Sequence, residues 1–225
     1  PTPTAADGFG RAVDVSGDRI AVGADLDDST GPDVGQAHLF EAFTGERIAT
    51  LDDPSPGSTD RFGHAVAIDD RFVAVGAPRG ATGGLAVGQV HVFDARTGAF
   101  LHTLSDPTPT DGDLFGGAVA LEAGVLLVGA SGDGTAGAGV GQAHLFDAET
   151  GALLRTLDDP SPSGGDRFGT AAELDRGRAL LGAPSDSCDL GASDPGQAYL
   201  FDVETGALLQ TFANPSPDSG DCFGV

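Results

Sequence analysis

The chain has 225 residues, and its 34 acidic and 11 basic side chains give a formal net charge of −23 at pH 7. A chain this negative repels phosphate backbones and anionic lipid, so nucleic acid and membrane surfaces are poor partners. No apolar run approaches the ~18 residues of a membrane span, so we expect no membrane insertion. Hydrophobic residues make up 40% of the chain, which indicates a folded core rather than a disordered acidic tail.

The acidic excess has two readings. It keeps a protein soluble at high salt, where screening weakens self-repulsion, and so fits a salt-adapted, halophilic source. It fits equally well an ordinary acidic secreted protein from a high-GC genome. The sequence does not open with a basic segment followed by an apolar one, so no signal peptide is expected within it.

One motif recurs along the chain at a nearly constant step. Its Phe-Gly pair appears five times, at Phe9, Phe62, Phe115, Phe168 and Phe223. A Gly-Gln pair recurs with the same step and places glutamines at Gln36, Gln89, Gln142 and Gln197. We therefore predict one repeat domain over residues 1–225, with repeats at 1–53, 54–106, 107–159 and 160–214 and a partial fifth copy at 215–225.

Each repeat contains four short segments with the composition of β-strands. In the second repeat they are residues 64–68, 72–77, 89–95 and 99–104. Valine, leucine and phenylalanine alternate there with small residues, and no window keeps a helical spacing. The linkers between repeats carry prolines, which cannot donate a ladder hydrogen bond. The pattern predicts an all-β protein in which each repeat forms a four-stranded antiparallel sheet.

A sheet of this size buries little surface by itself. Radial repetition lets each sheet pack face to face on the next and protects its edges. We therefore predict a β-propeller with four blades in this chain. A β-helix solenoid uses shorter repeats, and a β-sandwich gives no reason for the sequence to repeat.

The repeated motifs carry a family resemblance. Asp-x-Phe-Gly, then "VAVGAP", Gly-Gln and "VFDARTG" resemble the FG-GAP repeat of integrin-α-like β-propellers, in particular the bacterial and archaeal type with a short first hairpin. The resemblance covers essentially the whole chain. The segment "FDAETGALLRTL" also resembles the blades of quinoprotein propellers, which we attribute to a shared hairpin of the third and fourth strands.

The number of blades stays open. The resemblance implies a seven-bladed ring, which needs more repeats than the four in this sequence. The chain is then either a four-bladed propeller or part of a larger ring, and we favour the second reading. An incomplete ring exposes two apolar sheet faces, so we expect a homo-oligomer, a closing partner or a continuation of the propeller.

The repeated residues have structural explanations. The phenylalanine is an apolar anchor between sheets, and the glycine after it permits close backbone approach. The acid two residues before the phenylalanine can fix the turn into the strand. Equivalent positions hold His38, His91, His144 and Tyr199; because separate blades hold these histidines apart, we interpret them as packing residues rather than ligands of one metal.

A calcium site is expected in the first repeat. The integrin-like family binds calcium in its first hairpin, and that hairpin is too short here. The loop "DLDDSTGPD" instead offers side-chain oxygens and one carbonyl at alternate positions, from Asp25, Asp27, Ser29, Gly31 and Asp33. Thr30 stands where such loops usually have glycine, and a solvated acidic loop is the alternative.

The two cysteines are predicted to form a disulfide. Strand direction alternates within a blade, so the loop holding Cys188 and the linker holding Cys222 should emerge on the same face. A disulfide fits an oxidising, extracellular or cell-surface location. Two unrelated thiols are the alternative.

No nucleophile, base and acid cluster in a catalytic pattern, and no glycine-rich loop leads into a helix. We therefore expect no enzyme but an extracellular module for adhesion, ligand recognition or cell-surface structure. Its protein or carbohydrate ligand would meet the loops at residues 25–35, 79–88, 131–141 and 185–196. One alternative is a repetitive subunit of a surface layer or filament. Another is a hydrolase or quinoprotein-like oxidoreductase that uses the axial face.

Overall fold

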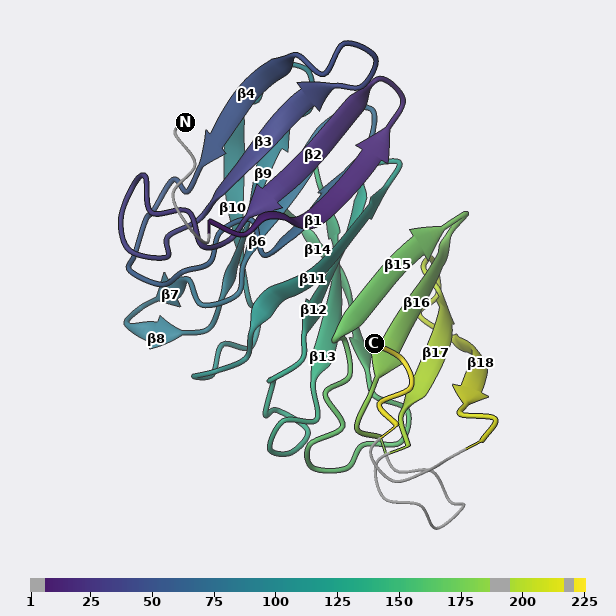
Figure 1. Ribbon diagram of the computed structural model, residues 1–225. Helices are drawn as coiled ribbons and strands as arrows, with labels where there is room; N and C mark the ends of the chain where they lie inside the picture. The colour runs from purple at the N-terminus through teal and green to yellow at the C-terminus, as the bar shows by residue number, and fades with distance from the viewer. Residues whose placement is uncertain (1–6, 187–194, 217–220) are drawn as a thin grey trace.

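The computed structural model describes residues 7–186, 195–216 and 221–225, and their regular secondary structure is entirely β (Figure 1). The strands form four separate four-stranded antiparallel sheets, each drawn from one sequence repeat. We call these sheets blades one to four. None of the described residues forms a helix with the length and apolar character needed to cross a bilayer.

Each blade contains its strands in chain order. Blade one contains β1 (Phe9–Ser16), β2 (Arg19–Ala24), β3 (Gln36–Glu41) and β4 (Arg47–Asp52). Blade two contains β5 (Ala65–Ile68), β6 (Phe72–Ala77), β9 (Gln89–Asp94) and β10 (Phe100–Ser105). Blade three contains β11 (Phe115–Glu122), β12 (Val125–Ala130), β13 (Gln142–Asp147) and β14 (Leu153–Asp158). Blade four contains β15 (Ala171–Asp175), β16 (Arg178–Ala183), β17 (Gln197–Asp202) and β18 (Leu208–Ala213).

The prediction of an all-β chain with four antiparallel strands per repeat is confirmed. The strands in blade two begin and end within one residue of the predicted segments. Alternation of large apolar and small residues made them recognisable, because both faces of a blade are covered. A small hairpin of β7 (Ala81–Thr82) and β8 (Leu85–Ala86) was not predicted, since its Gly-rich sequence lacks that alternation.

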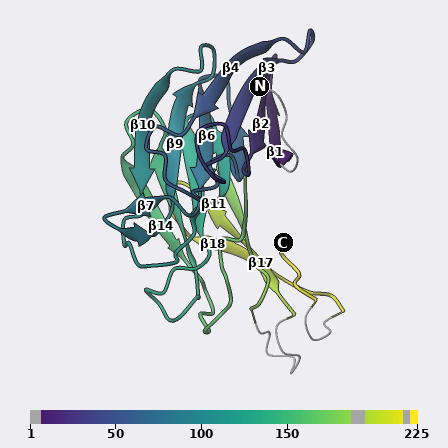
Figure 2. The same cartoon turned by 60° about the vertical axis from the view of Figure 1, so that its left-hand side comes forward.

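The blades fan out from a common axis, with the first strand of each blade innermost (Figure 1). β1 lies beside β5, β5 beside β11, and β11 beside β15. β1 and β15 make no comparable contact. Figure 2 shows β1 of blade one and β17 of blade four set apart at the two ends of the arc. An open groove of about 660 Å³ follows the inner strands of the first three blades.

The core lies between the blades rather than inside one sheet. Phe62 is fully buried in a cluster that joins Leu39 and Leu51 of blade one to Phe93 of blade two. Phe115 and Phe168 are also fully buried and occupy the same position at the next two junctions. Burial of a phenylalanine in such a core contributes about 2–3 kcal/mol, so the repeated anchor holds adjacent blades together.

The outer faces of the end blades are less covered. In blade one, Phe9 is 61% exposed and Val13 and Val15 are exposed on β1. In blade four, Leu209 and Phe212 are exposed on β18. The backbone of Phe223, from the partial fifth copy, lies against Gly196 of blade four as Phe62 lies against Gly35 of blade one. The start of each copy therefore docks on the preceding blade.

Candidate functional site

One face of the arc is built from loops and linkers that are hydrogen-bonded to each other. The loop between the second and third strands of a blade pairs with the linker that leads into the next blade. The Phe62 amide donates to the Val34 carbonyl at 2.8 Å, and the Phe115 amide donates to the Val87 carbonyl at 2.9 Å. Phe168 and Val140 repeat this contact. Loop and linker thus emerge together, as alternating strand direction requires.

The loop between the second and third strands of blade two differs from the described parts of the other such loops. It contains the β7–β8 hairpin, which extends from this face (Figure 1). Leu85 is 43% exposed there. Residues 187–194 of the corresponding loop in blade four lie outside the described residues.

The predicted calcium loop uses three of its proposed ligand groups, the Asp25 and Asp27 carboxylates and the Gly31 carbonyl, in protein contacts. Asp25 is buried, and its carboxylate lies 3.0 Å from His64 Nδ1. Asp27 is also buried and accepts a hydrogen bond from the Ser29 amide at 2.8 Å. The Gly31 carbonyl accepts the Val34 amide, and the Asp33 amide donates to Asp28. Asp25, Asp27 and Asp33 do not form a group with metal-ligand spacing in the described chain, and calcium binding there stays a prediction.

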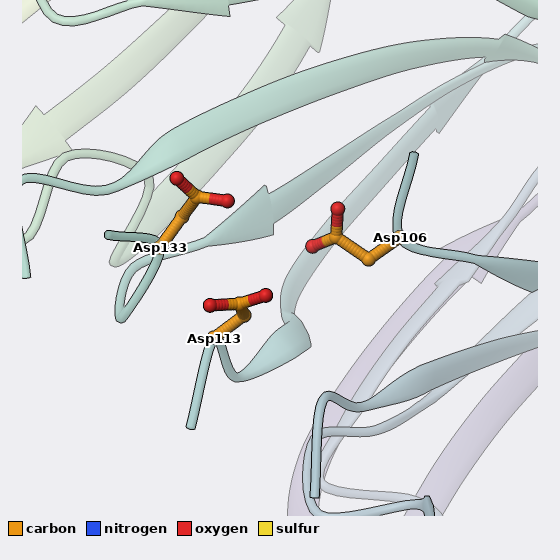
Figure 3. A group of neighbouring side chains, drawn as sticks. All are labelled: Asp106, Asp113 and Asp133. Atoms are coloured by element: carbon orange, nitrogen blue, oxygen red, sulfur yellow. The ribbon is translucent and has the colours of Figure 1, made fainter. Parts of the chain in front are cut away.

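A different group of carboxylates meets at the junction between blades two and three (Figure 3). Asp106 and Asp113 lie on the linker between β10 and β11, and Asp133 lies on the loop between β12 and β13. One oxygen from each lies within 4.8 Å of the other two. All three side chains are buried, and in Figure 3 their carboxylates point toward one another. Among the described residues, this is the group whose spacing suits a metal ion.

The junction has more acceptor oxygens than donors. The Thr108 hydroxyl lies 3.3 Å from Asp106 Oδ1, from Asp133 Oδ2 and from Gln142 Oε1, and it has one proton to donate. The other oxygen of Asp106, Oδ2, is buried and has no hydrogen-bond partner. Asp113 is better satisfied, because it accepts from the amide and hydroxyl of Thr110.

Burial controls the ionisation of these groups. Burial raises the pKa of Asp106 and of Asp113 above the usual value for aspartate, and backbone or side-chain hydrogen bonds partly oppose this. His144 Nε2 lies 4.0 Å from Asp106 Oδ1, but burial lowers the pKa of His144 to about 4. The imidazole is therefore neutral at pH 7, and the junction concentrates negative charge without a protein cation to offset it.

The same junction occurs three times with different side chains. Between blades one and two, Asp53 and Asp60 occupy the positions of Asp106 and Asp113, but Gly80 replaces the third carboxylate. Between blades three and four the positions are held by Asp159, Asp166 and Asp186. From the sequence, Asp60, Asp113 and Asp166, the acids two residues before the phenylalanine, were given a turn role, and the aspartates of a junction were not grouped. These aspartates recur at the same repeat positions, and the loop and the linker emerge on the same face. Together, these two observations would have predicted the cluster from the sequence.

The histidines at the equivalent repeat position act as packing residues within their own blades. His91 and His144 are fully buried, and each hydrogen-bonds a threonine of the neighbouring strand, Thr103 or Thr156. Tyr199 takes this position in blade four, and its hydroxyl contacts Asp186 and Ser161. At each junction, one side chain of the third strand therefore lies against an aspartate of the junction: His91 against Asp53, His144 against Asp106, and Tyr199 against Asp186.

Acidic residues also line the axial groove, and they hold neighbouring blades together. Asp14 of blade one accepts the Ile68 amide of blade two at 2.8 Å. Asp69 of blade two accepts the Gly124 amide of blade three at the same distance, and Glu122 of blade three accepts the Arg176 amide. These carboxylates are engaged in structural hydrogen bonds.

The predicted disulfide cannot be placed. Cys188 lies outside the described residues, while Cys222 is exposed at the start of the fifth copy. The pairing stays a prediction.

Blades that fan around an axis, with Phe-Gly segments docked on the preceding blade, define a β-propeller repeat protein. The model of the FG-GAP repeat matches residues 3–40, 48–93 and 103–146, which is more than half of the chain. The chain therefore belongs to the FG-GAP repeat family, as the motif resemblance indicated. The comparison with curated proteins found no match.

Proposed function

We propose that this chain is a non-catalytic extracellular module that recognises a protein or carbohydrate ligand through its loop face. FG-GAP repeats suggest a propeller module of this kind, often from extracellular proteins. The observation that carries the proposal is the pairing of every second-to-third-strand loop with a linker in the described junctions. This pairing holds variable loops on a rigid scaffold, which is where binding residues concentrate.

The side chains of the loop face favour a protein ligand over a sugar. The chain has no tryptophan, and aromatic residues make up 6% of it. Sugar-binding sites usually stack aromatic rings against the sugar, whereas the exposed Leu85 hairpin suits an apolar contact with a protein. The excess of acidic residues favours a ligand with basic groups near the contact.

The axial groove supports the non-catalytic part of the proposal. Five acids line the groove, and three of them, Asp14, Asp69 and Glu122, accept backbone N–H groups from the adjacent blade. A catalytic carboxylate must be within reach of its substrate proton, and these are committed to the scaffold. A hydrolase or oxidoreductase would have to use other groups of the groove, such as Asp70 or Glu173.

The proposal is tested by replacing the exposed hairpin at residues 81–86 with a Gly-Ser linker of equal length. We expect the purified chain to bind members of a panel of extracellular-matrix proteins and glycans, and the replacement to abolish that binding. The matched control is Arg96→Ala, because the β9–β10 turn lies at the opposite end of the strands. Equal binding by both variants, or turnover of hydrolase or quinone-linked substrates by the wild type, would contradict the proposal.

A second candidate is a structural subunit that joins end to end. Phe9, Val13 and Val15 expose more than half of their surface at the end of blade one, which favours burial against another sheet. Sedimentation velocity distinguishes the candidates. Long particles that grow with protein concentration favour the structural subunit, and a concentration-independent small species favours the recognition module.

A further inference from the structure

We propose that Asp106, Asp113 and Asp133 bind one calcium ion that ties blade two to blade three. The site lies between the linker that enters blade three and the loop between β12 and β13. It is distinct from the loop at residues 25–33 and from the short first hairpin.

The spacing of the carboxylates matches the size of the ion. Calcium takes oxygen ligands at about 2.4 Å, so two ligands on opposite sides of the ion are separated by about 4.8 Å. The oxygens offered by Asp106, Asp113 and Asp133 all lie within 4.8 Å of one another. An ion among them can therefore contact all three with little movement of the backbone.

A second observation points to a missing cation. The Asp106 side chain is fully buried, yet its Oδ2 atom has no hydrogen-bond partner. The equivalent atoms of Asp53 and Asp159 share this property, but among the described residues only Asp106 belongs to a group of three carboxylates with metal-ligand spacing. Its carboxylate points toward the other two (Figure 3). A buried carboxylate oxygen without a donor destabilises the folded protein, and that penalty disappears when the oxygen ligates a cation. The single Thr108 proton cannot satisfy the three acceptors around it.

The donor set favours calcium over zinc or magnesium. The three carboxylates, together with the Thr108 hydroxyl and the Gln142 carbonyl oxygen beside them, are all oxygen donors. Zinc prefers nitrogen and sulfur, and magnesium retains several waters in an octahedral shell. His144 is not part of the group with metal-ligand spacing. Its counterpart His91 lies at a junction with only two carboxylates, so a histidine at this repeat position is not tied to the presence of three carboxylates.

The other two junctions show which part of the site is special. At the junction of blades one and two, Gly80 occupies the third position with the same backbone hydrogen bond, since Gly80 and Asp133 both donate to the alanine three residues before them. At the junction of blades three and four, the Tyr199 hydroxyl donates to Asp186, and the three aspartates there do not form a group with metal-ligand spacing among the described residues. The first junction therefore has two carboxylates, the second has three with metal-ligand spacing, and the third has three of which one is hydrogen-bonded by Tyr199.

Binding at this site stabilises the junction by mass action. The ion contacts two segments that must be in their native positions, and it has few such ligands in the unfolded chain. Calcium should therefore raise the thermal midpoint of the wild-type chain as its concentration exceeds the dissociation constant.

The test is calorimetric titration of the EDTA-treated full chain with CaCl₂, and with MgCl₂ and ZnCl₂ as comparison cations. Asp106→Asn keeps the side-chain shape but removes a charge, and Asp133→Gly recreates the position that Gly80 holds at the first junction. We expect either change to weaken calcium binding at least about tenfold, because the number of charged ligands sets calcium affinity. The accompanying rise of the thermal midpoint with calcium should shrink in parallel.

The matched control is Asp53→Asn. Asp53 is equally buried, caps the Ser55 amide at 2.8 Å as Asp106 caps Thr108, and has His91 beside it at 3.6 Å. We expect its calcium affinity to stay within about twofold of wild type. Asp33→Asn tests the loop at residues 25–33 in the same titration, and we expect this variant to bind calcium as the wild type does.

Three outcomes would overturn the proposal. They are an absence of calcium binding by the wild type at millimolar concentration, an equal loss in Asp53→Asn and Asp106→Asn, and tighter binding of zinc or magnesium than of calcium. Circular dichroism at each variant's working temperature establishes that it is folded, and if Asp106→Asn is unfolded, Asp133→Gly decides the result.

Discussion

A methyl group added to Gly76 in blade two would lie 2.0 Å from the carbonyl oxygen of Gly116 in blade three. Gly76 belongs to the "VGAP" part of one repeat, and Gly116 to the Phe-Gly part of the next. Gly23 and Gly63 meet in the same way one blade earlier. The two most recognisable motifs of the repeat are therefore the two sides of one seam between blades.

We predict that Gly76→Ala destabilises the protein by about 3 kcal/mol or more, because the obstacle is backbone that must move. Gly134→Ala is the control, since its nearest neighbour is the Thr110 hydroxyl at 4.0 Å, and it should change stability by less than about 1 kcal/mol. Urea denaturation of the three proteins measures both values. Similar unfolding free energies for the two variants would refute a tight seam.

The Phe-Gly phenylalanines should differ sharply in energetic importance although they share one motif position. Phe62 is fully buried between blades, and Phe9 is 61% exposed. We predict a loss of about 3–5 kcal/mol for Phe62→Ala and less than about 1 kcal/mol for Phe9→Ala. Chemical denaturation tests this, and comparable losses would mean that Phe9 is covered in solution, for instance by another copy.

Acidification should destabilise the protein through His91. Burial lowers the pKa of His91 to about 4, so the unfolded chain, with a pKa near 6.5, binds the proton first as pH falls. Stability from neutral His91 is complete above pH ~6.5 and is lost between there and pH ~4, about 2 kcal/mol of it by pH 5. Phe62, Phe100, Thr103 and Asp53 surround the ring.

The His91→Phe variant isolates this effect. Burial raises the pKa of Asp53, which favours the folded state on acidification and so opposes the histidine, but Asp53 is present in both proteins. The difference in unfolding free energy between wild type and variant should therefore fall by about 2 kcal/mol from pH 7 to pH 5. A pH-independent difference would show that His91 is not buried in its neutral form.

Sodium chloride should raise the thermal midpoint. The net charge of −23 gives strong self-repulsion in the compact state, and raising ionic strength from 0.1 to 1 M shortens the screening length from about 10 to about 3 Å. We expect an increase of a few degrees, which corresponds to about 1–2 kcal/mol for a chain of this size. A scanning calorimeter measures it, and a fall in the midpoint would argue against charge repulsion as a controlling term.

The sequence predicted the strands well because each apolar run has both faces covered and is bounded by Gly, Pro or Asp. It also placed the second-to-third-strand loops beside the linkers. It also predicts a calcium site at residues 25–33, where donors alternate along one segment, and that site stays a prediction. It missed the Asp106 cluster, because its carboxylates come from two segments that the fold brings together across a blade junction. It missed the β7–β8 hairpin because "ATGGLA" is short and weakly apolar.

The repeat itself was decided by sequence alone. A motif that recurs at one step must form the same local sheet each time, because hydrogen-bonding alternation and turn chemistry act over a few residues. Tertiary structure decided which of the repeated linker acids lies within metal-ligand distance of two further carboxylates. Asp53, Asp106 and Asp159 occupy the same place in the repeat, yet their surroundings differ through Gly80, Asp133 and Tyr199. Those neighbours lie far along the chain, and packing of successive blades sets what each carboxylate meets.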